Sequence, residues 1–311
     1  MSVIGQEYKN VPTLGMNAYA APSLFQPHKA RQAIRDAHEK KIPPLMCYYA
    51  GLSSLPITRF LAPMGYDAVW IDWEHTSCNV ETMTSMVHEA IFMSQGRTIP
   101  WVRVPGHDHA AIGYALDCGA SVPSTAPSSA AHALLPPFRL IPFLTDTPYD
   151  PNRDIHKCVN DQAAIMIQIE SAEGVRNLDA ILTECPDIDV VWFGTLDCRV
   201  SMNLEAKMGG MGADEPEWLE ISKLFFDTID KHDKPYAGFA FCAPPYGSPE
   251  KLREAAKRMS LISMSADVLH LGALAQDLMV ARETIGPVGR ENGNGTNGKE
   301  AEKTEEVNGK A

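Results

Sequence analysis

Basic residues are in short supply in this chain. Lys and Arg together number 27 against 39 Asp and Glu, so the 311 residues carry a formal net charge of −12 at pH 7. This balance argues against nucleic acid and anionic membrane surfaces as partners, because both attract an excess of positive charge. A small anionic substrate stays compatible with it, because cations close to a site outweigh a distant net charge.

Long apolar runs are also missing. No stretch approaches the roughly 20 apolar residues that span a bilayer. Residues 1–27 lack the basic start and the apolar stretch of a signal peptide. The expectation is a cytoplasmic protein that does not insert into membranes.

Cysteine is sparse and scattered. The seven cysteines are odd in number and form no Cys-x-x-Cys pair, so neither a zinc site nor a disulfide framework is indicated. Reduced thiols in a cytosolic protein fit this usage.

Short apolar runs do recur, with helical patterns between them. Strands are expected at 45–49, 68–71, 99–103, 164–169, 190–193, 236–241 and 261–264. Helices are expected at 30–40, 80–95, around 112–116, around 175–182 and from a capping arrangement at 214–217 to about 231. This alternation in a chain of sufficient length predicts an α/β fold, a TIM (β/α)8 barrel of roughly 250 residues. The expected organisation is an N-terminal arm at 1–27, the barrel at 28–285 and a disordered tail at 286–311, which is rich in Gly, Asn, Glu and Lys.

Chargeable residues stand at the ends of several of these strands. Glu170 and Asp197 close consecutive runs, Asp72 follows the run 68–71, and Arg103 ends the run 99–103. Catalytic groups of β/α barrels lie at strand carboxyl ends. A pair of carboxylates suits Mg²⁺ or Mn²⁺, although the same residues would serve as helix N-caps and spacing alone does not separate these readings.

Together these segments resemble the HpcH/HpaI aldolase family, metal-dependent enzymes that cleave 2-keto-hydroxy acids to pyruvate and an aldehyde. The resemblance runs from about residue 30 to 283, and its specificity comes from the order of motifs that are each weak alone. The motifs are Asp72-Trp73-Glu74-His75, Arg103 before Val104-Pro105, Leu116-Asp117-Cys118-Gly119-Ala120, Gln168-Ile169-Glu170, Gly194-Thr195-Leu196-Asp197 and Ser265-Ala266-Asp267.

The resemblance implies a role for each site residue. Glu170 and Asp197 would hold the Mg²⁺ or Mn²⁺ ion, and Arg103 would stabilise the negative charge of the developing enolate.

The remaining roles concern proton transfer and substrate binding. His75 would be the general base for the hydroxyl proton, and Asp72 would orient its imidazole. Gln168 would hold a metal-bound water or the substrate, and backbone amides around Leu196 and Asp197 would bind the substrate carboxylate. Glu74 is left open, as a solvated charge or as a bridge to Arg103.

One segment departs from the family pattern. Residues 121–136 are mostly Ser, Pro and Ala where a fourth strand and helix belong. The expectation is a degenerate fourth β/α unit with no well-formed strand, and at most one helical turn at 130–135.

The partners implied are a small 2-keto acid, an aldehyde, and further copies of the chain, because the family forms homo-oligomers, typically hexamers. Two alternatives remain. One is a catalytically weakened barrel that serves as a binding or structural subunit, which the degenerate unit favours. The other is a citrate-lyase-like acyl-CoA lyase, a branch that tends to carry Asn where this chain has Pro105.

Overall fold

The computed structural model describes residues 14–21, 26–106, 109–125, 145–147, 150–154, 160–207, 214–243 and 246–291. The chain divides into two compact units, residues 1–268 and 269–311.

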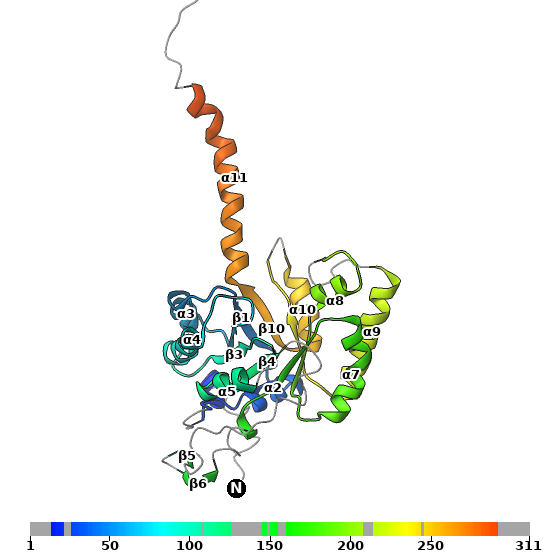
Figure 1. Ribbon diagram of the computed structural model, residues 1–311. Coiled ribbons are helices and arrows are strands. Elements are labelled where there is room, and N and C mark those ends of the chain that lie inside the picture. Colours follow the sequence, from blue (N-terminus) through cyan, green and yellow to red (C-terminus); the bar gives the residue numbers. More distant parts are fainter. Residues whose placement is uncertain are drawn as a thin grey trace, which may run out of the picture. The chain divides into compact units, whose positions relative to one another are not determined.

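Parallel strands of the first unit form a barrel of the TIM-barrel type (Figure 1). They close in the order β1-β10-β9-β8-β7-β4-β3-β2. Every strand expected from an apolar run is present. The strands are β1 Leu45–Ala50, β2 Ala68–Asp72, β3 Ile99–Arg103, β4 Val122–Thr125, β7 Met166–Ile169, β8 Val190–Phe193, β9 Tyr236–Phe239 and β10 Met259–Ala266.

The expectation that no fourth strand forms was wrong. Strand β4 pairs with β3 from Trp101↔Val122 to Arg103↔Ser124, and also with β7. On the β3 side, the Ser121 amide donates to the Pro100 carbonyl, and Val104 donates to Ser124. Pro123 has no N–H for Val102, and the Ser124 hydroxyl donates to the Val102 carbonyl instead, at 3.4 Å. The neighbouring strands therefore supply the ladder that composition alone did not predict.

A small antiparallel ribbon follows β4 in the chain. It consists of β5 Thr145–Thr147 and β6 Asp150–Asp154, which pair with each other and stand apart from the barrel order. The possible helical turn at 130–135 lies outside the described residues.

Helices alternate with the strands as expected. The helices are α2 Ala30–His38, α3 Leu55–Leu61, α4 Val80–Met93, α5 His109–Asp117, α7 Ala172–Glu184, α8 Thr195–Ser201, α9 Pro216–Lys231, α10 Pro249–Arg258 and α11 Asp267–Glu291, with short 3-10 turns η1 Gly15–Tyr19 and η2 Ala62–Met64. Side-chain N-caps begin α3, α4, α7 and α10 at Ser54, Asn79, Ser171 and Ser248.

The capping arrangement expected before α9 was wrong. Glu215 is the N-cap residue by position, but its side chain caps no backbone amide. Its carboxylate instead accepts hydrogen bonds from both terminal nitrogens of Arg199, at 3.1 and 2.9 Å. A bidentate pair with a buried guanidinium competes successfully with a cap.

Two apolar layers hold the first unit together. The outer layer lies between barrel and helices and includes Met83, Met86 and Val87 of α4. The inner layer fills the barrel, and there the buried rings of Trp70 and Trp101 stack at 4.3 Å between centroids. Inward-facing residues thus alternate with outward ones along each strand, which places the last inward residue of a strand at the barrel mouth.

Helix α11 continues to Glu291, so the tail expected to be disordered from residue 286 begins with helix instead. Residues 292–311 lie outside the described residues. Leu271, Leu274, Leu278 and Ile285 recur on the helix at a heptad-like spacing, and all four are exposed. No helix in the described part of the chain is long and apolar enough to cross a bilayer.

Candidate active site

The expected site residues gather at the carboxyl ends of neighbouring strands. Asp72 and Arg103 are the last residues of β2 and β3 and stand opposite each other in the register. Glu170 follows β7 directly, and Asp197 lies in the first turn of α8, after β8. Because β2, β3, β4, β7 and β8 are consecutive around the barrel, these strand ends line one sector of its mouth.

Arg103 is the centre of the arrangement. Its side chain is 10% exposed and its Nε donates a short hydrogen bond to Oε2 of Glu74. Its Nη2 donates to Oε1 of Glu170 at 3.3 Å, while Nη1 lies 3.9 Å from Oδ2 of Asp72. The planar guanidinium therefore lies against three carboxylates, two at the end of β2 and one after β7, and it donates hydrogen bonds to Glu74 and Glu170.

Asp72 shapes the turn that carries His75. Its Oδ1 accepts hydrogen bonds from the backbone amides of Glu74 and His75, at 2.9 and 3.0 Å. Its Oδ2 accepts one from the Tyr49 hydroxyl at 2.6 Å. Asp72 thus fixes the backbone at His75 rather than the imidazole, and it does not cap α4, whose N-cap is Asn79.

Glu74, which the sequence left without a role, lies between His75 and the guanidinium of Arg103. Its Oε2 lies 3.6 Å from Nε2 of His75 and also accepts the hydrogen bond from Arg103. The His75 side chain is 62% exposed, so the imidazole can reach a ligand at the mouth. Of the two readings kept for Glu74, the bridge to Arg103 is the one observed.

Glu170 occupies an environment that favours its neutral form. Burial raises the pKa of its carboxyl, as do the negative charges of Asp197 and Glu74, while Arg103 opposes the rise. Gln168 donates from Nε2 to Oε1 of Glu170 at 3.1 Å. A nearby cation would lower the pKa of Glu170 again.

Gly194 makes room for this carboxylate. A Cβ built on Gly194 would lie 2.5 Å from Cγ of Glu170, so any side chain at this position would displace the glutamate. The glycine of the Gly-x-x-Asp motif is therefore required by packing against Glu170.

The donor set suits a hard divalent cation. Among the described residues there is no group of three or more His, Cys, Asp or Glu side chains arranged to hold a metal. Glu170 and Asp197 offer two carboxylates, however, and Oε1 of Gln168 is buried without a hydrogen-bond partner. Two carboxylates and an amide oxygen, completed by water and substrate oxygens, fit Mg²⁺ or Mn²⁺.

Helix α8, which carries Leu196 and Asp197, is anchored from its far side. The fully buried Arg199 forms an ion pair with Glu215 and donates a hydrogen bond from Nε to the Glu205 carbonyl at 2.8 Å. Its Cζ lies 5.0 Å from the ring centroid of Trp218. Leu196, expected to offer its backbone amide, has a side chain that is 41% exposed.

Two further residues at this end of the barrel were not found from the sequence. Tyr49 supports Asp72, and its position at the end of the first strand was an available signal. Phe239, the last residue of β9, is 43% exposed although its ring contacts the buried indoles below. No sequence pattern distinguished it from an ordinary strand residue.

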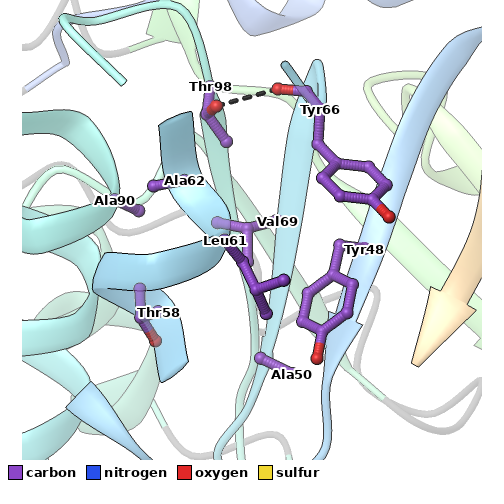
Figure 2. Close-up of a pocket in the computed structure, with 9 residues that line it drawn as sticks. All are labelled: Tyr48, Ala50, Thr58, Leu61, Ala62, Tyr66, Val69, Ala90 and Thr98. Carbon is purple, nitrogen blue, oxygen red and sulfur yellow. Dashed lines mark hydrogen bonds between the residues drawn. The ribbon is translucent and has the colours of Figure 1, made fainter. Parts of the chain in front are cut away.

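A separate small cavity lies on the outer side of the barrel wall, between β1 and β2 and the helices α3 and α4. Its lining is largely apolar, and Thr98 donates a hydrogen bond to the Tyr66 carbonyl at its edge (Figure 2). Tyr48 and Val69 face it from the strands. It contains none of the charged groups described above, so it is a packing gap rather than the site of chemistry.

Comparison with known proteins agrees with this geometry. Residues 45–213 match the family model HpcH/HpaI aldolase/citrate lyase. The chain is 25% identical over 245 residues to a hydroxypyruvate/pyruvate aldolase of Paraburkholderia phytofirmans, covering 74% of this chain and 90% of the relative. It is 30% identical over 199 residues to a 4-hydroxy-2-oxo-heptane-1,7-dioate aldolase of Shigella sonnei, covering 60% and 71%. The crystal structure of macrophomate synthase superposes with a TM-score of 0.72 at 27% identity, covering 87% of this chain and 94% of that one.

Proposed function

We propose a metal-dependent aldolase activity for this chain, which belongs to the HpcH/HpaI aldolase/citrate lyase family. The reaction is the cleavage or formation of a carbon–carbon bond in a 2-keto-hydroxy acid, with pyruvate as product or donor and an aldehyde as the other partner. The observation that carries the proposal is the guanidinium of Arg103, which connects Glu170 to the segment that bears His75.

Glu170, Asp197 and Oε1 of Gln168 would hold Mg²⁺ or Mn²⁺, and the bound ion would act as a Lewis acid toward the keto and carboxylate oxygens of the substrate. Backbone amides at Leu196 and Asp197 would bind the substrate carboxylate beside it. The raised pKa of Glu170 supports this assignment, because the site favours a positive charge next to that carboxylate.

Arg103 would bind the keto oxygen. Its Nε and Nη2 are held by Glu74 and Glu170, whereas Nη1 lies beyond hydrogen-bond distance of Asp72. The Nη1 end is therefore the part of the guanidinium that can turn to a substrate oxygen. A donor placed there stabilises the charge that develops on that oxygen as the bond breaks.

His75 would move the proton. In the cleavage direction the neutral imidazole removes the proton of the C4 hydroxyl, the C3–C4 bond breaks, and the aldehyde carbonyl forms. The electron pair of the broken bond becomes the enolate, and protonation of its carbon gives the methyl group of pyruvate. Glu74 stabilises the imidazolium, 3.6 Å away, and Asp72 holds the backbone that carries it.

The rival hypothesis of a weakened barrel has lost its main support. That hypothesis depended on a missing fourth strand between Arg103 and Glu170, and β4 pairs with both neighbours there. The proposed active form is a homo-oligomer, and the apolar stripe of α11 supports this part of the proposal.

Enolisation of pyruvate in deuterium oxide tests the proposal without knowledge of the aldehyde. NMR should show loss of the methyl protons when the protein and Mn²⁺ or Mg²⁺ are both present, and only background loss after chelation. Background exchange with the metal-loaded protein would refute the proposed activity.

A further inference from the structure

The mouth of the barrel has a second sector with different chemistry from the charged one. Phe239 ends β9, next to the end of β8. Its ring is 43% exposed although the strand residues before it are buried. A large aromatic side chain that faces inward and is still exposed must open toward the barrel mouth.

Ring contacts connect Phe239 to the charged sector. Its ring centroid lies 4.9 Å from that of Trp192 in an edge-on arrangement and 5.7 Å from that of Trp70 in a stacked one. The same Trp70 ring has Cζ of Arg103 6.0 Å from its centroid. Phe239 and Arg103 therefore both lie next to the indole of Trp70, each at the carboxyl end of its strand.

The segment after β9 extends this aromatic surface. Phe241 stacks on Phe239 at 5.6 Å, and Tyr246 lies 5.9 Å from Phe241. A Cβ at Gly247 would lie 1.7 Å from the Phe241 carbonyl oxygen, so the backbone can approach Phe241 this closely only because residue 247 is glycine. The Gly247 amide donates to the Ala243 carbonyl at 2.9 Å.

We infer that Phe239, backed by Phe241, is the wall of the subsite for the aldehyde partner, and that the preferred aldehyde carries an apolar group, aromatic or alkyl. This inference rests on the proposed function. The charged sector accounts for the keto and carboxylate oxygens, which leaves the substituent of the aldehyde to extend toward the other strands. An exposed phenyl ring stacked on buried rings favours an apolar group and offers no hydrogen-bond donor to a carboxylate or a hydroxyl group.

The test compares aldehydes in the synthesis direction with pyruvate and Mn²⁺. The full-length protein should show kcat/KM values for benzaldehyde and hexanal at least tenfold above those for glyceraldehyde and succinic semialdehyde. Phe239→Ala should reduce the ratio of kcat/KM for apolar over polar aldehydes at least tenfold. Phe239→Leu should restore this ratio more for hexanal than for benzaldehyde. Phe92→Ala is the matched control, because Phe92 is 75% exposed on α4 and belongs to neither sector.

A binding measurement that needs no catalysis distinguishes loss of the apolar surface from loss of folding. Saturation-transfer NMR should detect benzyl alcohol on the unmodified protein and on Phe92→Ala, and a weaker signal on Phe239→Leu. Circular dichroism confirms that each variant is folded.

The outcomes separate the two proposals. If the unmodified protein exchanges the pyruvate methyl protons but shows no preference for apolar aldehydes, the inference is overturned and the proposed function stands. If it exchanges no protons, both fall. If Phe239→Ala changes the mass by light scattering and leaves the aldehyde ratio unchanged, the aromatic face is covered by another copy of the chain, which also overturns the inference.

Discussion

Replacing Arg103 by lysine is the most informative single perturbation of the site. The change keeps one positive charge but removes the planar fork. Arginine connects Glu74 through Nε and Glu170 through Nη2, and lysine has a single nitrogen for the same partners. The variant must therefore abandon at least one of these carboxylates.

The cost can be estimated from the hydrogen bond that Nη1 would donate to the keto oxygen. A hydrogen bond to a charged group contributes about 1.5–3 kcal/mol, and the Arg103 side chain is only 10% exposed, so solvent replaces little of it. A loss of this size in the transition state corresponds to a fall in turnover of about 10- to 100-fold. We expect at least the tenfold loss, with most of it in kcat, because Arg103 acts on charge that develops during the reaction.

The assay is the metal-dependent methyl exchange of pyruvate at saturating pyruvate, with urea unfolding of each variant in parallel. Arg253→Lys is the matched control, since Arg253 is 72% exposed on α10 and pairs with Glu250 one helical turn away. Full exchange activity in Arg103→Lys or Arg103→Ala would show that the arginine is structural and would refute the mechanism.

Three further predictions concern metal binding, acid stability and assembly. Calorimetry should show Mn²⁺ binding, and Glu170→Gln or Asp197→Asn should weaken that binding at least tenfold. Glu173→Gln, at an exposed position on α7, should leave it unchanged. Equal Mn²⁺ affinity in all these variants would refute the metal assignment. Burial lowers the pKa of His28 to about 4, so between pH 6.5 and 4 the unfolded chain binds a proton at this residue that the folded chain does not, and the contribution of His28 to the free energy of unfolding should fall by about 3 kcal/mol across that window. Urea unfolding measured at several pH values should show a smaller fall of the free energy of unfolding in His28→Gln. The same pH dependence in both proteins would contradict the prediction. Leu278→Glu on the exposed stripe of α11 should lower the mass measured by light scattering, and a monomer already in the unmodified protein would remove the oligomer proposal.

The sequence predicted the strands best where they are most apolar. Residues 68–71, 99–103 and 190–193 all form strands, because burial on both faces demands continuous apolar runs. Strand β4 was missed for the converse reason. Its residues include Pro123 and Ser124 instead of a continuous apolar run, and it is paired by the backbones of β3 and β7, which its own composition does not reveal.

The site was predictable in its positions and not in its contacts. That Asp72, Arg103 and Glu170 stand at strand ends follows from periodicity. That Asp72 binds backbone amides, and that Glu74 bridges His75 and Arg103, depends on side-chain directions that no spacing specifies. The capping role expected before α9 was wrong for the same reason, because the carboxylate of Glu215 accepts hydrogen bonds from the guanidinium of Arg199 instead of a backbone amide.

We propose that this barrel mouth enolises pyruvate with a divalent metal held by Glu170 and Asp197. NMR in deuterium oxide with Mn²⁺ can follow the pyruvate methyl signal for the unmodified protein, Glu170→Gln and Glu173→Gln. We expect rapid loss of signal for the unmodified protein and Glu173→Gln, and a rate at least tenfold lower for Glu170→Gln. Equal rates in all three proteins would refute the proposed metal-dependent enolisation.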